Sequence, residues 1–116
     1  MEHEFVSQGI ASMFAGGLGN TGSVCGAVIG AAMAIGLKIG RADTMEGALN
    51  KLELAKEFRR RFEEEVGTIS CRELTGADLT TPEGIEQYMN SDTPGMVCVA
   101  AVNTAHRLAV ELLKET

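Results

Sequence analysis

Apolar residues recur at helical rather than alternating spacing near the start of the chain. This pattern predicts a first helix over residues 3–15 that stops at the Gly16-Gly17 pair. Residues 24–37 are all apolar or glycine, and residues 23–39 have no polar face until Lys38, which predicts a second helix over 23–39 that is central and surrounded by the others. Its many glycines and alanines would let neighbouring helix backbones approach closely.

The next two segments begin with capping signals. Asp43 followed by Glu46 has the spacing of a capping box and predicts the start of a third helix that ends at Gly67. The expected apolar stripe of this helix consists of Met45, Ala48, Leu52, Ala55, Phe58 and Phe62. Ser70 and Glu73 repeat the capping-box spacing, which predicts a short helical turn that ends near Gly76.

The last forty residues divide into a polar segment and a helix. Ala77–Asp92 is mostly polar and predicts a loop with one turn at Pro82–Met89. Thr93 as a cap and Pro94 in the first turn predict a last helix to about Lys114. One face of that helix carries Cys98, Ala101, Ala105, Leu108 and Leu112.

We therefore expect an all-α protein, with one domain over residues 1–116 that forms a compact bundle of four main helices around residues 23–39. Hydrophobic residues make up 45% of the chain but aromatic residues only 4%, so the core must rely on aliphatic side chains and close helix contacts. Because only three other long helices can cover the apolar second helix, we also expect a homodimer whose interface buries part of the first or second helix.

Charge and terminal composition exclude several classes of function. A net charge of -6 argues against nucleic-acid binding, and the basic run Arg59–Arg61 precedes Glu63–Glu65 at the spacing of helical ion pairs. The acidic N-terminus does not resemble a signal peptide, and the apolar run of 14 residues over 24–37 is shorter than the roughly 20 needed to cross a bilayer. We expect a cytoplasmic protein without a membrane span.

The glycine-rich loop contains a G-x-G-x-x-G run from Gly17 to Gly22. A dinucleotide site needs a strand before this run and a second strand that presents an acid to the ribose, whereas the pattern here predicts helices on both sides. The alternative is that the loop sets the start of the second helix. Thr21 or Ser23 would be its N-cap, which would place Cys25 in the first turn.

All three cysteines lie near predicted helix starts. Unpaired N–H groups at a helix start stabilise a thiolate, so a convergence of these starts would suit reactive thiols, a soft metal ion or an iron–sulfur cluster. Free cysteines also pack as small hydrophobic residues, so inert packing remains an alternative. We expect His106 to flank the core rather than to act as a ligand.

Three segments together resemble a known family: "GSVCGAVIGAAMAIGLKIGR", "EFRRRFEEEVGTISCRELTG" and the late cysteine Cys98. They are similar to the C_GCAxxG_C_C family of small helical proteins, which are considered redox-active because of their cysteines. The resemblance implies that Cys25, Cys71 and Cys98 are catalytic thiols or metal ligands. It also implies that a cofactor would contact Gly22, Gly26, Ala27 and Gly30.

The chain departs from the family pattern at one point, because no cysteine precedes Cys25 where the family has its first cysteine. We expect either a shortened member that has lost one ligand, or a fourth ligand that comes from a cofactor, solvent or another subunit. Three interpretations stay open: thiol redox chemistry with an unknown redox partner, binding of a metal ion or iron–sulfur cluster, and a structural helical module.

The redox interpretation makes Cys25 the thiolate and Cys71 or Cys98 its resolving partner. We predict that Cys25 and at least one of the other two lie within disulfide or shared-ligand reach, beside the Gly16–Gly22 loop.

Overall fold

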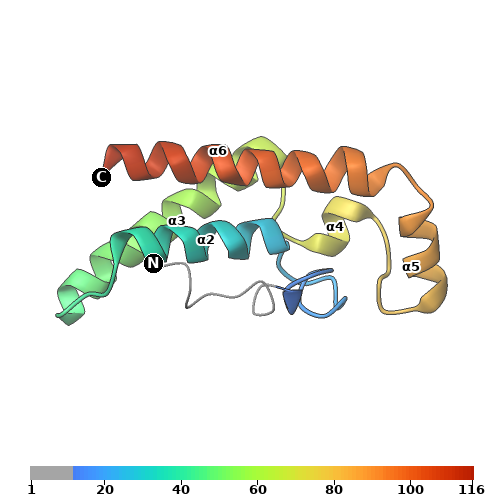
Figure 1. Cartoon of the computed structure of the whole chain (residues 1–116), viewed down its shortest axis with the longest axis horizontal. Coiled ribbons are helices and arrows are strands. Elements are labelled where there is room, and N and C mark those ends of the chain that lie inside the picture. Colours follow the sequence, from blue (N-terminus) through green and yellow to red (C-terminus); the bar gives the residue numbers. More distant parts are fainter. Residues whose placement is uncertain (1–11) are drawn as a thin grey trace.

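The computed structural model describes residues 12–116, and its long helices form one elongated body (Figure 1). These helices are α2 (Gly26–Ile39), α3 (Met45–Val66) and α6 (Val99–Glu115). The shorter helices α4 (Cys71–Thr75) and α5 (Pro82–Met89) and the π-helical turn η2 (Pro94–Cys98) lie at one end. Within the described residues there is no strand beyond one isolated β-bridge, so the predicted all-α class is confirmed.

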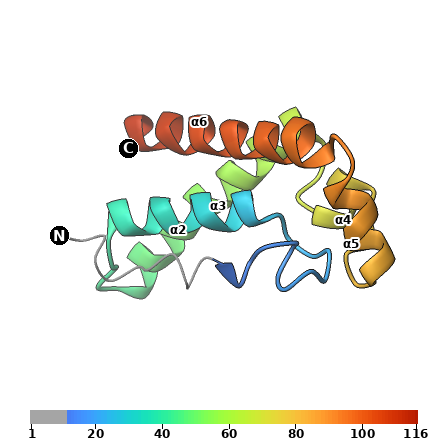
Figure 2. The same cartoon turned by 45° about the vertical axis from the view of Figure 1, so that its right-hand side comes forward.

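The core lies where α2, α3 and α6 meet. Helices α2 and α6 run side by side in both views, and α3 crosses them obliquely (Figures 1 and 2). The rings of Phe58 and Phe62 stack with centroids 6.1 Å apart at the centre of this core. The other core positions are small or aliphatic: Val28, Ala31, Ile35, Ala101, Ala105, Leu108, Ala109 and Leu112. Alanines on facing helices allow the close approach that the composition predicted.

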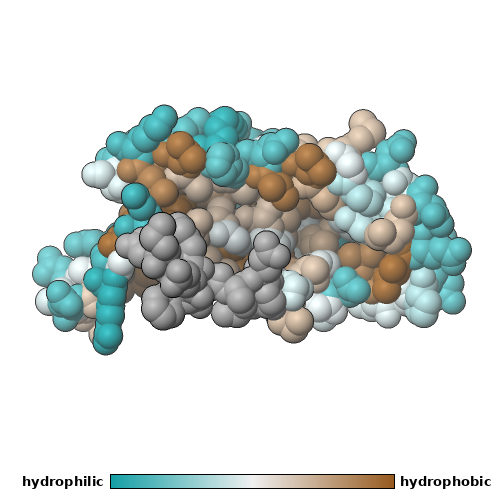
Figure 3. Space-filling model, in the orientation of Figure 1, coloured by the Kyte–Doolittle hydropathy of each residue, from teal (hydrophilic) through white to brown (hydrophobic). Residues whose placement is uncertain are grey.

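Two apolar faces are covered only in part by the described residues. Among residues 12–116, α3 and α6 pack against one side of α2, and Gly30, Ala34 and Gly36 are exposed. The predicted stripe of α3 is buried only in its second half, since Met45 is 76% and Leu52 57% exposed. In both views the start of α3 lies away from α6, which explains this exposure (Figures 1 and 2). Figure 3 shows brown apolar residues between polar ones on the side of the molecule where α6 lies.

The helix starts follow the capping chemistry, with three corrections. Ser70 caps α4 as predicted, accepting a hydrogen bond from the Glu73 N–H at 3.2 Å. Thr44, not Asp43, caps α3, because its extended backbone lets its hydroxyl accept from the Gly47 N–H at 3.0 Å. Thr93 is not a cap, because its own backbone is already helical. The predicted turn at 82–89 is the complete helix α5, capped by Thr81.

The predicted first helix, over residues 3–15, ends earlier than expected. Residues 3–11 of that helix lie outside the described residues. Residues 13–20 form turns, so the helix does not reach residue 15. From Gly16 to Asn20 successive residues take positive φ angles, so a right-handed helix cannot continue past the Gly16-Gly17 pair, as predicted.

The predicted ion pairs of α3 form in two cases out of three. Arg59 pairs with Glu63 at 2.6 Å and Arg60 with Glu64 at 2.8 Å, as the spacing indicated. Arg61 instead reaches Glu57 and, on α6, Glu115, while Glu65 pairs with Arg107 of α6. Tertiary packing of α3 on α6 therefore redirects the third arginine.

One helical segment of the described residues, Pro94–Glu115, is long and apolar enough to cross a membrane by length and composition alone. This is weak evidence for a span, because the core helix of a soluble domain passes the same test. Its apolar face, from Ala101 to Leu112, is buried against α2 and α3, and its other faces carry charged side chains such as Arg107 and Glu111.

Candidate functional site

A short backbone pairing brings two of the cysteines together. Val24 and Ser70 form an antiparallel bridge. On one side of it the Cys25 N–H donates to the Ile69 carbonyl at 2.7 Å, and on the other the Cys71 N–H donates to the Ser23 carbonyl at 2.6 Å. Because successive side chains in an extended pair alternate between faces, Cys25 and Cys71 share the face opposite Val24 and Ser70.

The glycine-rich loop is a left-handed turn that packs on Cys71. All five residues from Gly16 to Asn20 have φ between 60° and 74°, a region that glycine enters without steric cost. The Ser23 N–H donates back to the Gly17 carbonyl at 2.9 Å and so closes the loop. A Cβ on Gly17 would lie 2.7 Å from the Cβ of Cys71. The glycine thus serves a close approach to the cysteine rather than to a dinucleotide.

All three cysteines line one cavity of about 350 Å³, here called the thiol cavity. Its remaining walls come from the loop, the start of α2, the segment before α5, α5 itself and α6: Ala15, Gly16, Gly17, Asn20, Gly26, Ala27, Leu79, Ile85, Tyr88, Met89 and Val102. None of these side chains carries a formal charge. Among the described lining residues other than the cysteines, only Asn20 and Tyr88 offer polar side-chain groups, so this part of the cavity suits uncharged reactants.

The three thiols differ in accessibility. Cys71 is buried, whereas Cys25 and Cys98 are partly exposed, and none of them is in a disulfide. Burial raises the pKa of the Cys71 thiol, and the nearby sulfurs of Cys25 and Cys98 raise it further. Because the thiolate is the nucleophile in thiol chemistry, Cys71 is the least suited of the three to attack first.

Cys25 takes a slightly different place from the one predicted. It is the N-cap of α2 rather than a residue of its first turn, because the bridge to Ser70 holds the backbone through Cys25 in an extended conformation. Its carbonyl accepts the N–H groups of Val28 and Ile29. Gly26 and Ala27, the first two residues of α2, precede these donors and line the thiol cavity.

Cys98 stands at the junction of two helix types. The turn η2 inserts one residue per turn relative to an α-helix, as the bond from the Val99 N–H to the Pro94 carbonyl shows. In this position the sulfur of Cys98 lies 3.0 Å from the hydroxyl of Tyr88 on α5. The sequence reasoning missed Tyr88. The available signal was the helical spacing of Ile85, Tyr88 and Met89, which all line the thiol cavity.

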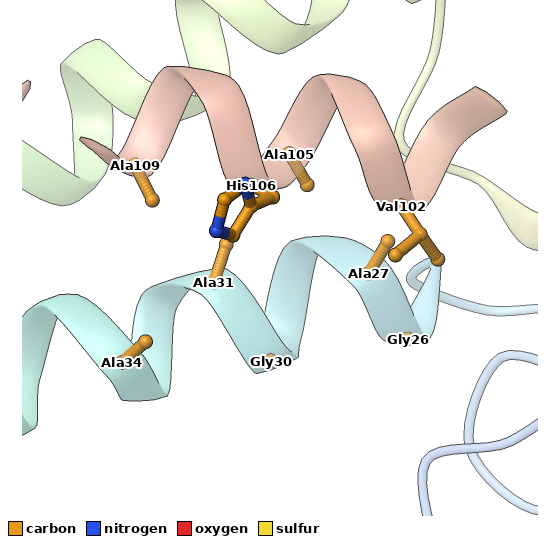
Figure 4. Close-up of a pocket in the computed structure, with 9 residues that line it drawn as sticks. All are labelled: Gly26, Ala27, Gly30, Ala31, Ala34, Val102, Ala105, His106 and Ala109. Atoms are coloured by element: carbon orange, nitrogen blue, oxygen red, sulfur yellow. The ribbon is translucent and has the colours of Figure 1, made fainter. Parts of the chain in front are cut away.

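The four residues predicted to contact a cofactor divide between two places. Gly26 and Ala27 line the thiol cavity. Gly22 ends the loop, where its carbonyl accepts from the Arg72 N–H at 3.2 Å, and it does not line the cavity. Gly30 lies in a separate groove of about 390 Å³ between α2 and α6, beside His106 (Figure 4). His106 is exposed and flanks the core, in line with the sequence.

The predicted metal site receives no support from the side-chain positions. Within residues 12–116, no three side chains of His, Cys, Asp or Glu are grouped so that they could hold a metal ion. The three cysteines do line one cavity. Their role as shared metal ligands stays a prediction. Whether any pair lies within disulfide reach stays a prediction.

Comparison with known proteins identifies a family over nearly the whole chain. The model of the family described as "Putative redox-active protein (C_GCAxxG_C_C)" matches residues 3–112. No curated protein and no solved structure matches the chain.

Proposed function

The chain belongs to the C_GCAxxG_C_C family, and from this premise we propose that it exchanges thiols with the disulfide of a partner protein. The observation that supports this proposal most is that all three cysteines are free thiols on the wall of one cavity. Inert cysteines that merely fill a core have no reason to share an opening to solvent. The uncharged lining supports a partner whose reacting segment is itself uncharged.

The proposed exchange takes two steps. In the first, the Cys25 thiolate attacks one sulfur of the partner disulfide, a mixed disulfide forms and one partner thiolate leaves. In the second, Cys98 or Cys71 attacks the Cys25 sulfur of the mixed disulfide, and the second partner thiolate leaves. The partner disulfide gains two electrons and becomes a dithiol. The protons that this chain's two thiols lose balance those that the partner thiolates gain.

Accessibility assigns the roles in this scheme. Cys25 is partly exposed and stands at the N-cap of α2 on the wall of the thiol cavity, so a partner sulfur can reach it first. Cys71 is buried behind Gly17, so a partner sulfur cannot reach it first. Either of the two remaining thiols can then resolve the mixed disulfide, since both line the same cavity as Cys25.

Trapping the mixed disulfide tests this scheme. The reduced protein is mixed with oxidised glutathione as the partner disulfide, and adducts are identified by mass spectrometry. We expect the double variant Cys71→Ser, Cys98→Ser to keep a glutathione adduct on Cys25, whereas the unmodified chain resolves it. The matched control is Cys25→Ser, which should form adducts far more slowly. Stable adducts on all three cysteines of the unmodified chain would contradict the proposal and favour independent, structural thiols.

The free thiols bear on the cellular compartment of the protein. Three free thiols persist in a reducing compartment, so we propose that the protein acts in the cytoplasm.

We also propose a homodimer, because apolar side chains such as Leu37, Leu49 and Leu52 are exposed on α2 and α3. Sedimentation at micromolar concentration checks the dimer: Leu52→Lys should weaken it, and a monomeric unmodified chain would contradict it.

A further inference from the structure

Tyr88 and Cys98 form a side-chain contact that the exchange scheme leaves unused. The phenol oxygen of Tyr88 lies 3.0 Å from the sulfur of Cys98, on the wall of the thiol cavity. A phenol is a strong donor, whereas a thiol is a weak donor whose sulfur accepts well once it is ionised. The direction of this hydrogen bond therefore decides whether Tyr88 favours the thiol or the thiolate of Cys98.

We propose that Tyr88 is a positioning residue that donates its hydroxyl proton to a hydrogen bond with the Cys98 sulfur and thereby makes Cys98 the resolving thiolate. This inference rests on the proposed exchange function and deepens it by choosing between the two candidate resolving cysteines.

The surroundings of the pair support this direction. Among the described residues that line the thiol cavity, the other titratable groups are the thiols of Cys25 and Cys71, and none is a charged side chain. The Tyr88 hydroxyl is the donor that the structure places in contact with the Cys98 sulfur. Burial, followed by the contact with Cys98, raises the pKa of Tyr88, so the phenol keeps its proton to donate.

Backbone hydrogen bonds near Tyr88 and near Cys98 hold both residues in position. The Tyr88 carbonyl accepts the Ser91 hydroxyl at 2.7 Å and the Ser91 N–H at 3.2 Å, which fixes the end of α5. The Met96 N–H bonds to the Asp92 carbonyl at 2.9 Å, and η2 then sets the direction of Cys98. Cys71, by contrast, is buried, and among the hydrogen bonds of residues 12–116 none is donated to its sulfur, so it has no contact like that between Tyr88 and Cys98.

Alkylation of single thiols tests the proposal without requiring any redox reaction. Two backgrounds are compared: Cys25→Ser with Cys71→Ser, which leaves Cys98, and Cys71→Ser with Cys98→Ser, which leaves Cys25. Each is combined with Tyr88→Phe and treated with iodoacetamide at neutral pH. Loss of a charge-assisted hydrogen bond reduces the thiolate fraction about tenfold, and the greater nucleophilicity of the remaining thiolate offsets part of this. We expect Cys98 to react about threefold more slowly and Cys25 at an unchanged rate.

A spectroscopic readout covers the case in which Tyr88→Phe fails to fold. Tyr88 is the only tyrosine and the chain has no tryptophan, so intrinsic fluorescence reports on this one phenol. We expect the fluorescence of the Cys98-only background to change when Cys98 is alkylated, and that of the Cys25-only background to change much less.

Two results would overturn the proposal: an unchanged or faster Cys98 reaction in Tyr88→Phe, or equal slowing of both cysteines, which would indicate a merely structural role. Either result leaves the trapping experiment on Cys25 unaffected, so failure of this inference and failure of the exchange scheme are distinguishable.

Discussion

Gly17 and Cys71 approach so closely that a Cβ on the glycine would lie 2.7 Å from the Cβ of the cysteine. The same Cβ would lie 2.6 Å from the backbone nitrogen of Ser23. Neither neighbour is the flexible end of a side chain, so the loop must move if the glycine is replaced. The conformation of the loop between Gly16 and Gly22 and the position of the Cys71 side chain therefore depend on each other.

Gly17→Ala should lower the free energy of unfolding by about 2–4 kcal/mol, because it combines a positive φ of 74° with this steric overlap. The matched control is Gly19→Ala, whose φ is 60° but whose Cβ would meet open space. It should cost only about 1–2 kcal/mol. Urea denaturation measures both, and equal losses would show that Gly17 is not in contact with Cys71.

Leu18→Gly should stabilise the protein. Leu18 has a φ of 71° and is 52% exposed, so its left-handed backbone costs free energy that little burial offsets. The substitution removes a backbone strain of about 1–2 kcal/mol. Glycine also gives the unfolded chain more conformational entropy, which offsets part of this, so the free energy of unfolding should rise by about 0.5–1 kcal/mol. Asn20→Gly should gain less, since asparagine adopts this conformation more readily. A loss of stability in Leu18→Gly by thermal denaturation would contradict the left-handed turn.

Stability should fall at alkaline pH because of Cys71. Its pKa in the folded protein is raised above its ordinary value of 9.0, so the unfolded chain releases the thiol proton first as pH rises. The stability that the neutral thiol contributes is thus present below pH 9 and is lost as pH rises through the folded pKa. Denaturation under reducing conditions should show a smaller alkaline loss in Cys71→Ala than in the unmodified chain. Parallel pH profiles would rule out the burial of this thiol.

Phe62→Ala should be the most damaging core substitution, with a loss of about 3–5 kcal/mol, because Phe62 is 0% exposed and stacks on Phe58. Leu52→Ala lies on the same helix but is 57% exposed in the single chain, so it should cost less than about 1 kcal/mol at protein concentrations low enough to dissociate the proposed dimer. Chemical denaturation at such a concentration compares the two variants. Similar losses of stability there would contradict the difference in burial between the two positions.

The sequence predicted those features of the fold that depend on neighbouring residues in the chain. The Ser70 cap, the glycines that end α3 and α4, and the buried face of α6 all follow from spacing and residue type. It did not predict how the helices are placed relative to one another, because that depends on tertiary packing. An apolar pattern shows that α2 can be buried on every side, but not that α3 and α6 both lie on the same side of it.

The candidate site shows the same division. Three cysteines near helix starts indicated a convergence, and the structure places all of them on one cavity. The contact between Tyr88 and Cys98 could not be predicted, because it depends on the π-helical turn η2, for which the sequence carries no specific signal. The consecutive positive φ angles at Leu18 and Asn20 were also invisible, since the pattern of glycines alone does not require them.

The central claim is that two cysteines of this chain act as one dithiol, and the most direct test is a disulfide map of the oxidised protein. The reduced chain is oxidised with glutathione disulfide, quenched in acid, digested without reduction and analysed by mass spectrometry. We predict one intramolecular disulfide that joins Cys25 to Cys98, with Cys25 to Cys71 as the lesser product, and the third thiol free. Three unpaired thiols, or pairing only between chains, would contradict the account.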